Sequence, residues 1–514
     1  MAIELSDLTF TEQDDIVPES GQYDQIVNTY IVNTLAGNDR ITGTGIEGAL
    51  SPYGFINEGI LNTADGDDII TGVRTDGFSV FNIINWGTLN TGEGDDLIDG
   101  SQGDFGYATS GIDATGTLNA GGGDDTITGA GTQDGIRVET GTLNMGEGND
   151  LINASGSYWG LGLSLSDGGT IDTGNGEDSV ICGEEFFNGG EVFLGEGNDS
   201  IIVTKYYNLD YESALYNSNT IDTGDGNDSI SSNRKITNTG EVFLGEGNDL
   251  LFTSGLDNYN NIEGGDGNDI IGSSGWIYNE GVINTGKGND SINSEGTALN
   301  RGNVFLGEND DSIISEGTFV NRGNVFLGEN NDSITADKEL DYSDRALENF
   351  NFIGTGDGND IITSNGIIYN EGVIETGNGD DSIIVDGGVD DITGNTYSIY
   401  NNGGAINMGD GNDSIVANEG FESAPNSSGA WFLGEGEDYI KGYGSGDFYG
   451  GNGNDTLELT SGTYTVGIWG EAGESPIFTR GDQLMITSEF EKLKAGSTIY
   501  DFTSLTAGQI IIVA

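Results

Sequence analysis

The residues best placed to do chemistry in this sequence are aspartates that end short glycine-rich turns, as in LGEGNDSI at Leu194–Ile201. Little side chain surrounds such a carboxylate. Glycines four and two residues before the aspartate permit positive φ, which turns backbone carbonyls toward it. Carboxylate and carbonyl groups are both hard oxygen ligands, so the turn suits a cation that prefers oxygen.

Close copies of this turn recur along most of the chain. Aligned on the aspartate of GND or GDD, the sequence contains 18 copies, most often 21 or 28 to 29 residues apart. A repeat of this length is typical of a solenoid, in which each copy forms one coil. The candidate metal ligands are the aspartates that end the turns: Asp39, Asp68, Asp96, Asp125, Asp150, Asp178, Asp199, Asp228, Asp249, Asp269, Asp290, Asp311, Asp332, Asp360, Asp381, Asp413, Asp438 and Asp455.

Apolar residues stand at fixed distances from each aspartate. The second residue after it is aliphatic in all 18 copies, as in Ile201 and Ile313, and the seventh residue before it is apolar in all 18, as in Val242 and Phe448. Around the latter position, apolar and polar residues alternate as in a half-buried strand. We therefore expect an all-β fold: a right-handed parallel β-solenoid, of the β-roll or β-helix kind, with about 18 coils and terminal caps.

An asparagine stands eleven residues before the aspartate in 13 of the 18 copies, for example at Asn57, Asn188, Asn238, Asn300 and Asn370. All length variation falls between the aliphatic residue after the aspartate and the next asparagine. We interpret these asparagines as a structural ladder, in which each amide bonds to its equivalent one coil away, and assign them no role at a ligand site.

Stacking the coils would place equivalent aspartates about 4.8 Å apart. At that distance two like charges repel by roughly 1 kcal/mol in water, or about 3 to 4 kcal/mol at an effective dielectric of about 20. Calcium, which accepts oxygen ligands in flexible geometry, would remove the repulsion better than magnesium, which demands a tight octahedron. We therefore expect multiple Ca²⁺ ions. The alternative is an Asx-type turn without metal, in which the side chain bonds only local backbone amides.

Composition excludes several classes of partner and chemistry. The 86 acidic residues against 15 basic ones give a net charge of −71, which argues against nucleic acid and anionic lipid. The chain has no histidine and one cysteine, so it lacks catalytic triads, internal disulfides and the nitrogen or sulfur ligands of zinc and copper. We interpret Cys182 as a small buried core residue. No long apolar run or N-terminal signal is present, so we expect no membrane insertion.

Two stretches match the nonapeptide G-G-x-G-x-D-x-U-x throughout, where U is aliphatic: GGDGNDII at Gly264–Ile271 and GGNGNDTL at Gly450–Leu457. From about Asn28 to Leu457 the chain resembles the repeats-in-toxin (RTX) family of hemolysin-type calcium-binding proteins. The resemblance implies that each ion is held between adjacent turns by the aspartates and by carbonyls of the glycine turn.

The chain departs from the RTX pattern in two ways. Family members usually repeat the nonapeptide in tandem, with ions along both edges, whereas each longer coil here has one copy. We therefore expect a single calcium ladder along one edge. Asn309 and Asn330 replace the second turn glycine, and asparagine tolerates the left-handed conformation.

The sequence divides into three parts. Residues 1–27 are expected to form an N-terminal cap or assembly strand, with IELSDLTF as a strand, and residues 28–457 the calcium-binding β-solenoid. Residues 458–514 are expected to form a C-terminal β cap, with strands in TYTVGIWG, DQLMITSEFEKL and GQIIIVA. The resemblance implies a type I secretion signal in this last part and a secreted, extracellular or cell-surface location. Low cytosolic calcium would then keep the chain unfolded until export.

The repeat occupies most of the chain, so we expect a structural or adhesive protein of the cell surface or extracellular matrix and not an enzyme. Its terminal coils would self-associate end to end into fibres or a surface layer. One alternative is a monomeric calcium-dependent adhesin, with a cell-surface polysaccharide as its partner. A second is a polysaccharide lyase or epimerase, which 15 scattered basic residues disfavour because uronate chemistry needs clustered cations.

Two smaller features have open interpretations. Arg301 and Arg322 stand at equivalent positions one coil apart and form either a basic spot for a ligand or, as we favour, counter-charges for nearby acids. The insertion at Thr335–Phe350 is charged and compatible with a helix. It is either a binding loop or solvated decoration.

Overall fold

The computed structural model describes residues 2–18, 24–45, 53–74, 81–103, 110–156, 160–205, 213–338, 344–424, 429–469 and 475–514. The chain divides into two compact units, Met1–Gly265 and Asp266–Ala514, called unit 1 and unit 2 below. In both units the regular structure is strand, apart from two short 3-10 helices, η1 (Leu5–Asp7) and η2 (Phe502–Ser504), among the described residues.

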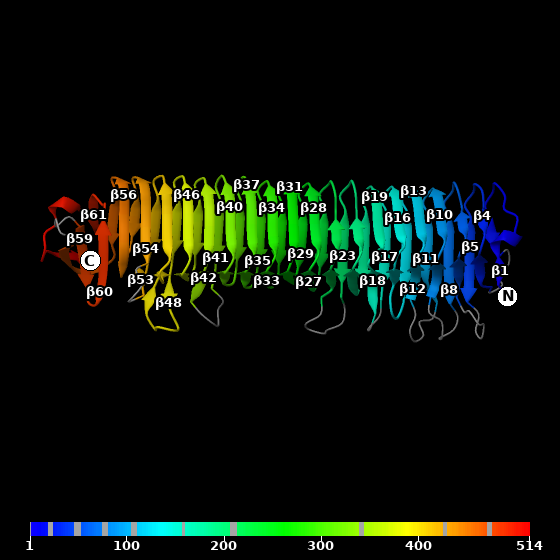
Figure 1. The fold of residues 1–514 in the computed structure, drawn as a ribbon, viewed down its shortest axis with the longest axis horizontal. Coiled ribbons are helices and arrows are strands. Elements are labelled where there is room, and N and C mark those ends of the chain that lie inside the picture. Colours follow the sequence, from blue (N-terminus) through cyan, green and yellow to red (C-terminus); the bar gives the residue numbers. More distant parts are fainter. Residues whose placement is uncertain are drawn as a thin grey trace. The chain divides into compact units, whose positions relative to one another are not determined.

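Each coil of unit 1 has three short strands. One coil consists of β12 (Ser110–Ala114), β13 (Thr117–Gly122) and β14 (Thr126–Ala130), and the next of β15 (Ile136–Val138), β16 (Thr142–Glu147) and β17 (Leu151–Ser155). Each strand pairs in parallel with its equivalent, and Leu118 lies opposite Leu143. Figure 1 shows the second strands β10 (Thr88–Glu93), β13, β16 and β19 (Thr170–Asn175) side by side. Unit 1 is therefore a parallel β-solenoid.

Unit 2 repeats the same coil. Its strands include β36 (Ala298–Asn300), β37 (Asn303–Glu308) and β38 (Ser312–Ser315), followed by β39 (Phe319–Asn321), β40 (Asn324–Glu329) and β41 (Ser333–Ala336). These pair in parallel with no shift in register. In both units the glycine-aspartate turn joins the second strand to the third. The expected all-β parallel β-solenoid is confirmed.

The core of each coil consists of the apolar positions that flank the turn. Val242 and Phe448, seven residues before the aspartate, and Ile201 and Ile313, two residues after it, are all buried. They alternate with half-buried or exposed neighbours, as in the burial pattern of β37 and β38. The side chains that point inward from the second strand and from the third strand are therefore apolar. The aspartate lies between these two strands, and its side chain is also buried.

The N-terminal segment forms the start of a coil. β1 (Ile3–Glu4) pairs in parallel with β3 (Ile26–Asn28), and β2 (Ile16–Val17) with β5 (Arg40–Gly45). Only the first two residues of IELSDLTF belong to a strand, because η1 follows at once and buries Leu5.

The C-terminal segment changes from parallel to antiparallel pairing. Its strands are β57 (Thr456–Leu459), β58 (Gly462–Trp469), β59 (Ser475–Arg480), β60 (Gln483–Ser488), β61 (Lys492–Ala495), β62 (Thr498–Asp501) and β63 (Ile510–Val513). β58 pairs antiparallel with β59 and β63, and β61 with β62. Strands therefore occur in all three segments where the sequence predicts them. β60 and β61 also continue the coil, in parallel with β56 (Gly446–Gly453) and β57.

The insertion at Thr335–Phe350 is not helical in its described part. Thr335 and Ala336 end β41, and β42 (Arg345–Asn349) is the first strand of the next coil, paired with β39. Residues 339–343 lie outside the described residues. In the described residues of the insertion the helix interpretation is wrong, because parallel pairing with β39 overrides the local preference of this charged segment.

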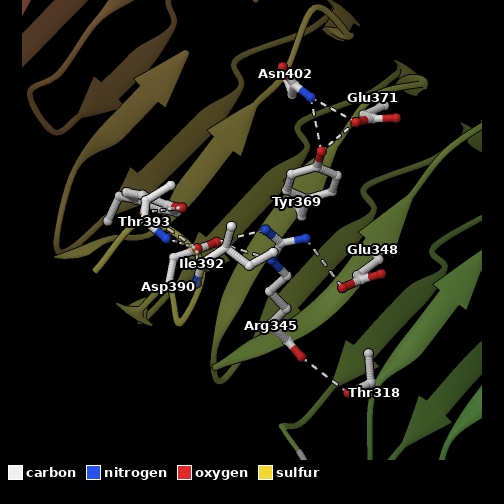
Figure 2. Close-up of polar contacts among 10 residues, drawn as sticks. Thr318, Arg345, Glu348, Tyr369, Glu371, Asp390, Ile392, Thr393 and Asn402 are labelled. Carbon is white, nitrogen blue, oxygen red and sulfur yellow. Dashed lines mark hydrogen bonds and ion pairs between the residues drawn. The ribbon is translucent and has the colours of Figure 1, made fainter. Parts of the chain in front are cut away.

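A hairpin of β48 (Gly388–Val389) and β49 (Thr396–Tyr397) projects from unit 2 and is fastened by a buried ion pair. Asp390 accepts hydrogen bonds from Nε and Nη2 of Arg345 at 3.1 and 2.8 Å (Figure 2). Burial alone would raise the pKa of Asp390, but hydrogen bonds from Tyr397 and Arg345 lower it to about 2. The Arg345 guanidinium also lies over the Tyr369 ring, 3.9 Å from its centroid.

Candidate metal centre

The predicted aspartates form a buried column in each unit. All 18 are at most 3% exposed, nine of them in each unit. The backbone N–H of one aspartate donates to Oδ1 of the aspartate one coil further on. The Asp178 amide, for example, lies 2.7 Å from Oδ1 of Asp199, and the Asp290 amide lies 2.7 Å from Oδ1 of Asp311. The structure therefore brings the predicted residues together within each unit.

These hydrogen bonds differ from those of a local Asx turn. Donor and acceptor stand one whole coil apart, for instance 21 residues between Asp178 and Asp199 and 29 between Asp199 and Asp228. Oδ1 therefore fastens neighbouring coils to each other, and the metal-free local turn does not describe this carboxylate.

The residue before each aspartate forms a second ladder that runs the opposite way. The backbone N–H of Asn227 donates to Oδ1 of Asn198 at 2.8 Å, so here the later coil is the donor. The same arrangement joins Asp124 to Asp95 and Asp380 to Asn359. These side chains are exposed, and together the two ladders fix both sides of the turn.

Glycine is required in the turn because neighbouring coils approach closely. Gly247 has a φ of +143°, and a Cβ added there would lie 1.5 Å from the carbonyl oxygen of Gly226. Asn309 and Asn330, which replace the equivalent glycine, both have a φ of +86°. The left-handed conformation expected for these asparagines is confirmed.

The second carboxylate oxygen of the column is the unusual group. Oδ2 is buried and has no hydrogen-bond partner in these aspartates: Asp39, Asp68, Asp96, Asp125, Asp150, Asp178, Asp199 and Asp228 in unit 1, and Asp290, Asp311, Asp332, Asp360, Asp381, Asp413, Asp438 and Asp455 in unit 2. A buried polar atom without a partner is costly, and more so when it is charged. Each of these oxygens therefore requires a proton or a cation.

The pKa values of the column reflect this requirement. Burial, together with the like charges of Asp178 and Asp228, raises the pKa of Asp199 to about 7 against the lowering effect of one backbone hydrogen bond. Burial likewise raises the pKa of Asp332 to about 8 and that of Asp413 to about 7. Near neutral pH, the column therefore resists ionisation unless positive charge accompanies it.

The donor atoms fit a hard cation. Beside Gly453, the position that a Cβ would take lies 1.5 Å from the carbonyl oxygen of Gly436 and 3.2 Å from Oδ1 of Asp455. A carbonyl oxygen of one coil and a carboxylate oxygen of the next thus lie close together, and both are ligands of the kind that calcium accepts. In the described part of the chain, no group of three or more acidic, cysteine or histidine side chains converges as a metal site. Carboxylates would therefore be supplemented by backbone oxygens.

The asparagines form the ladder that the sequence predicts. Nδ2 of Asn217 donates to Oδ1 of Asn238 at 2.8 Å and to the carbonyl of Glu241 at 2.9 Å. One coil departs from the spacing: Asn370 donates to Asn401, which stands twelve residues before Asp413, and not to Asn402. Asn402 instead donates to Tyr369 and Glu371 (Figure 2).

Cys182, Arg301 and Arg322 make contacts within the protein. Cys182 is fully buried, and burial raises the pKa of its thiol. Arg301 pairs with Glu280 at 3.4 Å, as expected for a counter-charge, whereas the Arg322 guanidinium lies over the Phe350 ring, 4.3 Å from its centroid.

Two carboxylates extend the columns beyond the repeat and were missed by sequence analysis. The Asp15 amide donates to Oδ1 of Asp39 at 2.8 Å, and the pairing of β2 with β5 places Asp15 opposite Asp39. At the other end, the Asp455 amide donates to Oε2 of Glu491 at 2.8 Å. Neither residue follows a glycine turn, but the aliphatic residue two positions later, Val17 or Leu493, was a signal that could have identified both.

Comparisons with known proteins add little to this geometry. No protein-family model matches the chain, and no curated protein matches it. A solved structure described as a hyperactive, Ca²⁺-dependent, β-helical antifreeze protein from an Antarctic bacterium is similar at 18% identity, covering 79% of this chain and 84% of that chain with a TM-score of 0.25. At that score the similarity carries no argument, so fold and site rest on the residues themselves. No helix in the described ranges has the length and apolar character to cross a membrane.

Proposed function

We propose that this chain is a calcium-dependent structural or adhesive protein of the extracellular space, whose coils are held together by Ca²⁺ along the aspartate columns. One observation carries the proposal: buried Oδ2 atoms without hydrogen-bond partners recur at the same position in coil after coil. Binding of the ion would supply the missing partner and neutralise the column, so binding free energy would become folding free energy.

Calcium is the cation that the donor set favours. The aspartates and the glycine-turn carbonyls are oxygen ligands, and a site shared by two coils has no rigid octahedron of its own. The resemblance to RTX proteins supports the same ion. It also leads us to propose type I secretion, because a chain that folds only in calcium would stay unfolded in the cytosol and fold outside.

Self-association through the terminal coils completes the proposal, with a second copy of this chain as the partner. Large apolar side chains are exposed at both ends: Tyr30 and Ile31 of the first full coil, and Ile499 and Ile512 of the C-terminal cap. Ile31 is 67% exposed and Ile512 is 72% exposed, although each belongs to a strand. Apolar strands at the ends of a solenoid are surfaces on which another chain can continue the stack.

A structural role agrees with the placement of the basic residues better than an enzymatic one. Lys205 pairs with Glu185, Lys235 with Asp257 and Arg345 with Asp390. These cations are each matched to a nearby acid in a different coil or hairpin. A lyase or epimerase acting on uronates would instead need cations gathered on one face.

Circular dichroism and electron microscopy of the same samples test the proposal. We expect the far-ultraviolet β-spectrum to disappear in a strong chelator at neutral pH and to return on titration with calcium but not with an equal concentration of magnesium. Ordered filaments or sheets should form only with calcium. A β-spectrum indifferent to chelation would overturn calcium-coupled folding, and separate particles with a calcium-dependent spectrum would replace self-association by the monomeric adhesin.

A further inference from the structure

The last parallel step of unit 2 joins the repeat to the C-terminal cap through two carboxylates. Pairing of β57 with β61 places Thr456 opposite Lys492, and therefore Asp455 beside Glu491. The Asp455 amide donates to Oε2 of Glu491 at 2.8 Å, and the amides of Glu491 and Lys492 both donate to the carbonyl of Asp455. Glu491 thus takes the place that the next aspartate of the column would have.

The turn before Glu491 is shorter than the repeat's glycine turn. Phe448 lies opposite Thr487, but only Ser488, Glu489 and Phe490 separate Thr487 from Glu491. The glutamate has one more methylene than aspartate, which lets its carboxylate reach the column from a shorter turn. Glu489 accommodates the tight path with a φ of +61°.

Oxygens converge at this step. A Cβ built on Gly450 would lie 1.9 Å from the carbonyl oxygen of Glu489 and 2.9 Å from Oδ2 of Asp455. Both oxygens therefore face one small space beside Gly450. Asp455 is fully buried, and its Oδ2 has no hydrogen-bond partner. A buried carboxylate oxygen that has no partner and lies near a backbone carbonyl oxygen needs a positive group beside it.

The described charged side chains near Asp455 do not supply this positive group. Glu437 and Glu489, like Glu491, act on Asp455 as like charges. Two lysines of adjacent strands, Lys494 and Lys441, are directed to another acid, since both form ion pairs with Glu458. The first end of the unit 1 column differs, because Oδ2 of Asp15 accepts the Thr11 amide at 2.7 Å.

We propose that Asp455, the Glu491 carboxylate and the carbonyl oxygen of Glu489 bind one further divalent cation, which fastens the C-terminal cap to the last coil. This rests on the proposed calcium-dependent function, because the ion is the one that fills the column. It goes beyond that function in naming a ligand outside the glycine-aspartate repeat. The cap docks through this ion, so its order depends on calcium as the coils do.

Hydrogen-exchange mass spectrometry of the full-length protein across a calcium titration tests the site. The Glu491→Gln variant is the probe, because glutamine keeps the oxygen that accepts the Asp455 amide and loses only the charge. Glu316→Gln is the matched control, since Glu316 is an exposed glutamate outside the column. Two peptides are followed: residues 483–501 in the cap and residues 303–329 in the repeat.

We expect Glu491→Gln to raise the calcium concentration for half-protection of the cap peptide by about tenfold or more, while the repeat peptide and the control variant stay unchanged. If both peptides of the wild-type chain ignored calcium, the proposed function and this site would both be wrong. If the repeat peptide responded but the cap peptide was protected without calcium, or Glu491→Gln matched the control, the site alone would be overturned.

Discussion

At the residue scale, each column aspartate has two oxygens with different tasks. Oδ1 of Asp199 accepts the Asp178 amide and would do so whether or not the group is ionised. Oδ2 has no hydrogen-bond partner, and burial raises the pKa to about 7. The ionised form therefore depends on a cation, whereas the protonated form is stable alone. Asparagine resembles the protonated form. An aspartate-to-asparagine substitution therefore keeps the oxygen that accepts the amide and removes the charge that would bind the cation.

We expect Asp199→Asn to lower the free energy of unfolding in calcium at neutral pH by about 1 to 3 kcal/mol, because one ligand charge is lost. In calcium-free buffer at about pH 5, where the aspartate keeps its proton, the variant should match the wild type. Urea unfolding under both conditions measures the difference. The control is Asp225→Asn, which removes an exposed charge from the next turn. It should change the free energy of unfolding little under either condition. Equal losses in both conditions would assign Asp199 a packing role only.

At the element scale, the sequence predicts the strands and register of the repeated coils. It predicts little about the segments that stand outside the repeat. The aliphatic positions around Asp311 have fixed spacing, so period-two burial and parallel register followed directly. Asp15 and Glu491 join the same columns without a glycine turn, because strand pairing and not the local motif places them there. Arg345 could not be assigned, since its partner Asp390 stands 45 residues away on a hairpin that no repeat defines.

The hairpin of β48 and β49 gives an element-scale prediction. Arg345 and Asp390 side chains are 11% and 0% exposed, so removing the arginine would leave a buried carboxylate without its main counter-charge. We expect Arg345→Met to cost about 3 kcal/mol or more. Hydrogen exchange at residues 388–397 should show the loss. Arg301→Met, which breaks an exposed pair with Glu280, should cost less than about 1 kcal/mol. Adding Asp390→Asn to Arg345→Met should recover part of the loss, and a lack of recovery would argue against the ion pair.

At the scale of the whole molecule, the columns couple folding to pH in the absence of calcium, and bound calcium removes this coupling. An aspartate has a pKa of 3.8 in the unfolded chain, whereas burial raises the pKa to about 7 at Asp68, Asp150 and Asp311 in the folded protein. Without calcium, the folded state therefore binds more protons than the unfolded state between these two values. Its stability is present at low pH and is lost as pH rises toward 7.

Calcium abolishes this dependence, because a bound ion keeps the carboxylates ionised in the folded state, as they already are in the unfolded chain above about pH 5. We expect the urea midpoint in calcium-free buffer to fall as the pH rises from about 5 to about 8, and the midpoint in saturating calcium to stay nearly constant over the same interval. Measuring both series at constant ionic strength keeps the screening of the −71 net charge equal. Parallel curves would mean that protons and calcium act at different groups, and the columns would then not be the calcium site.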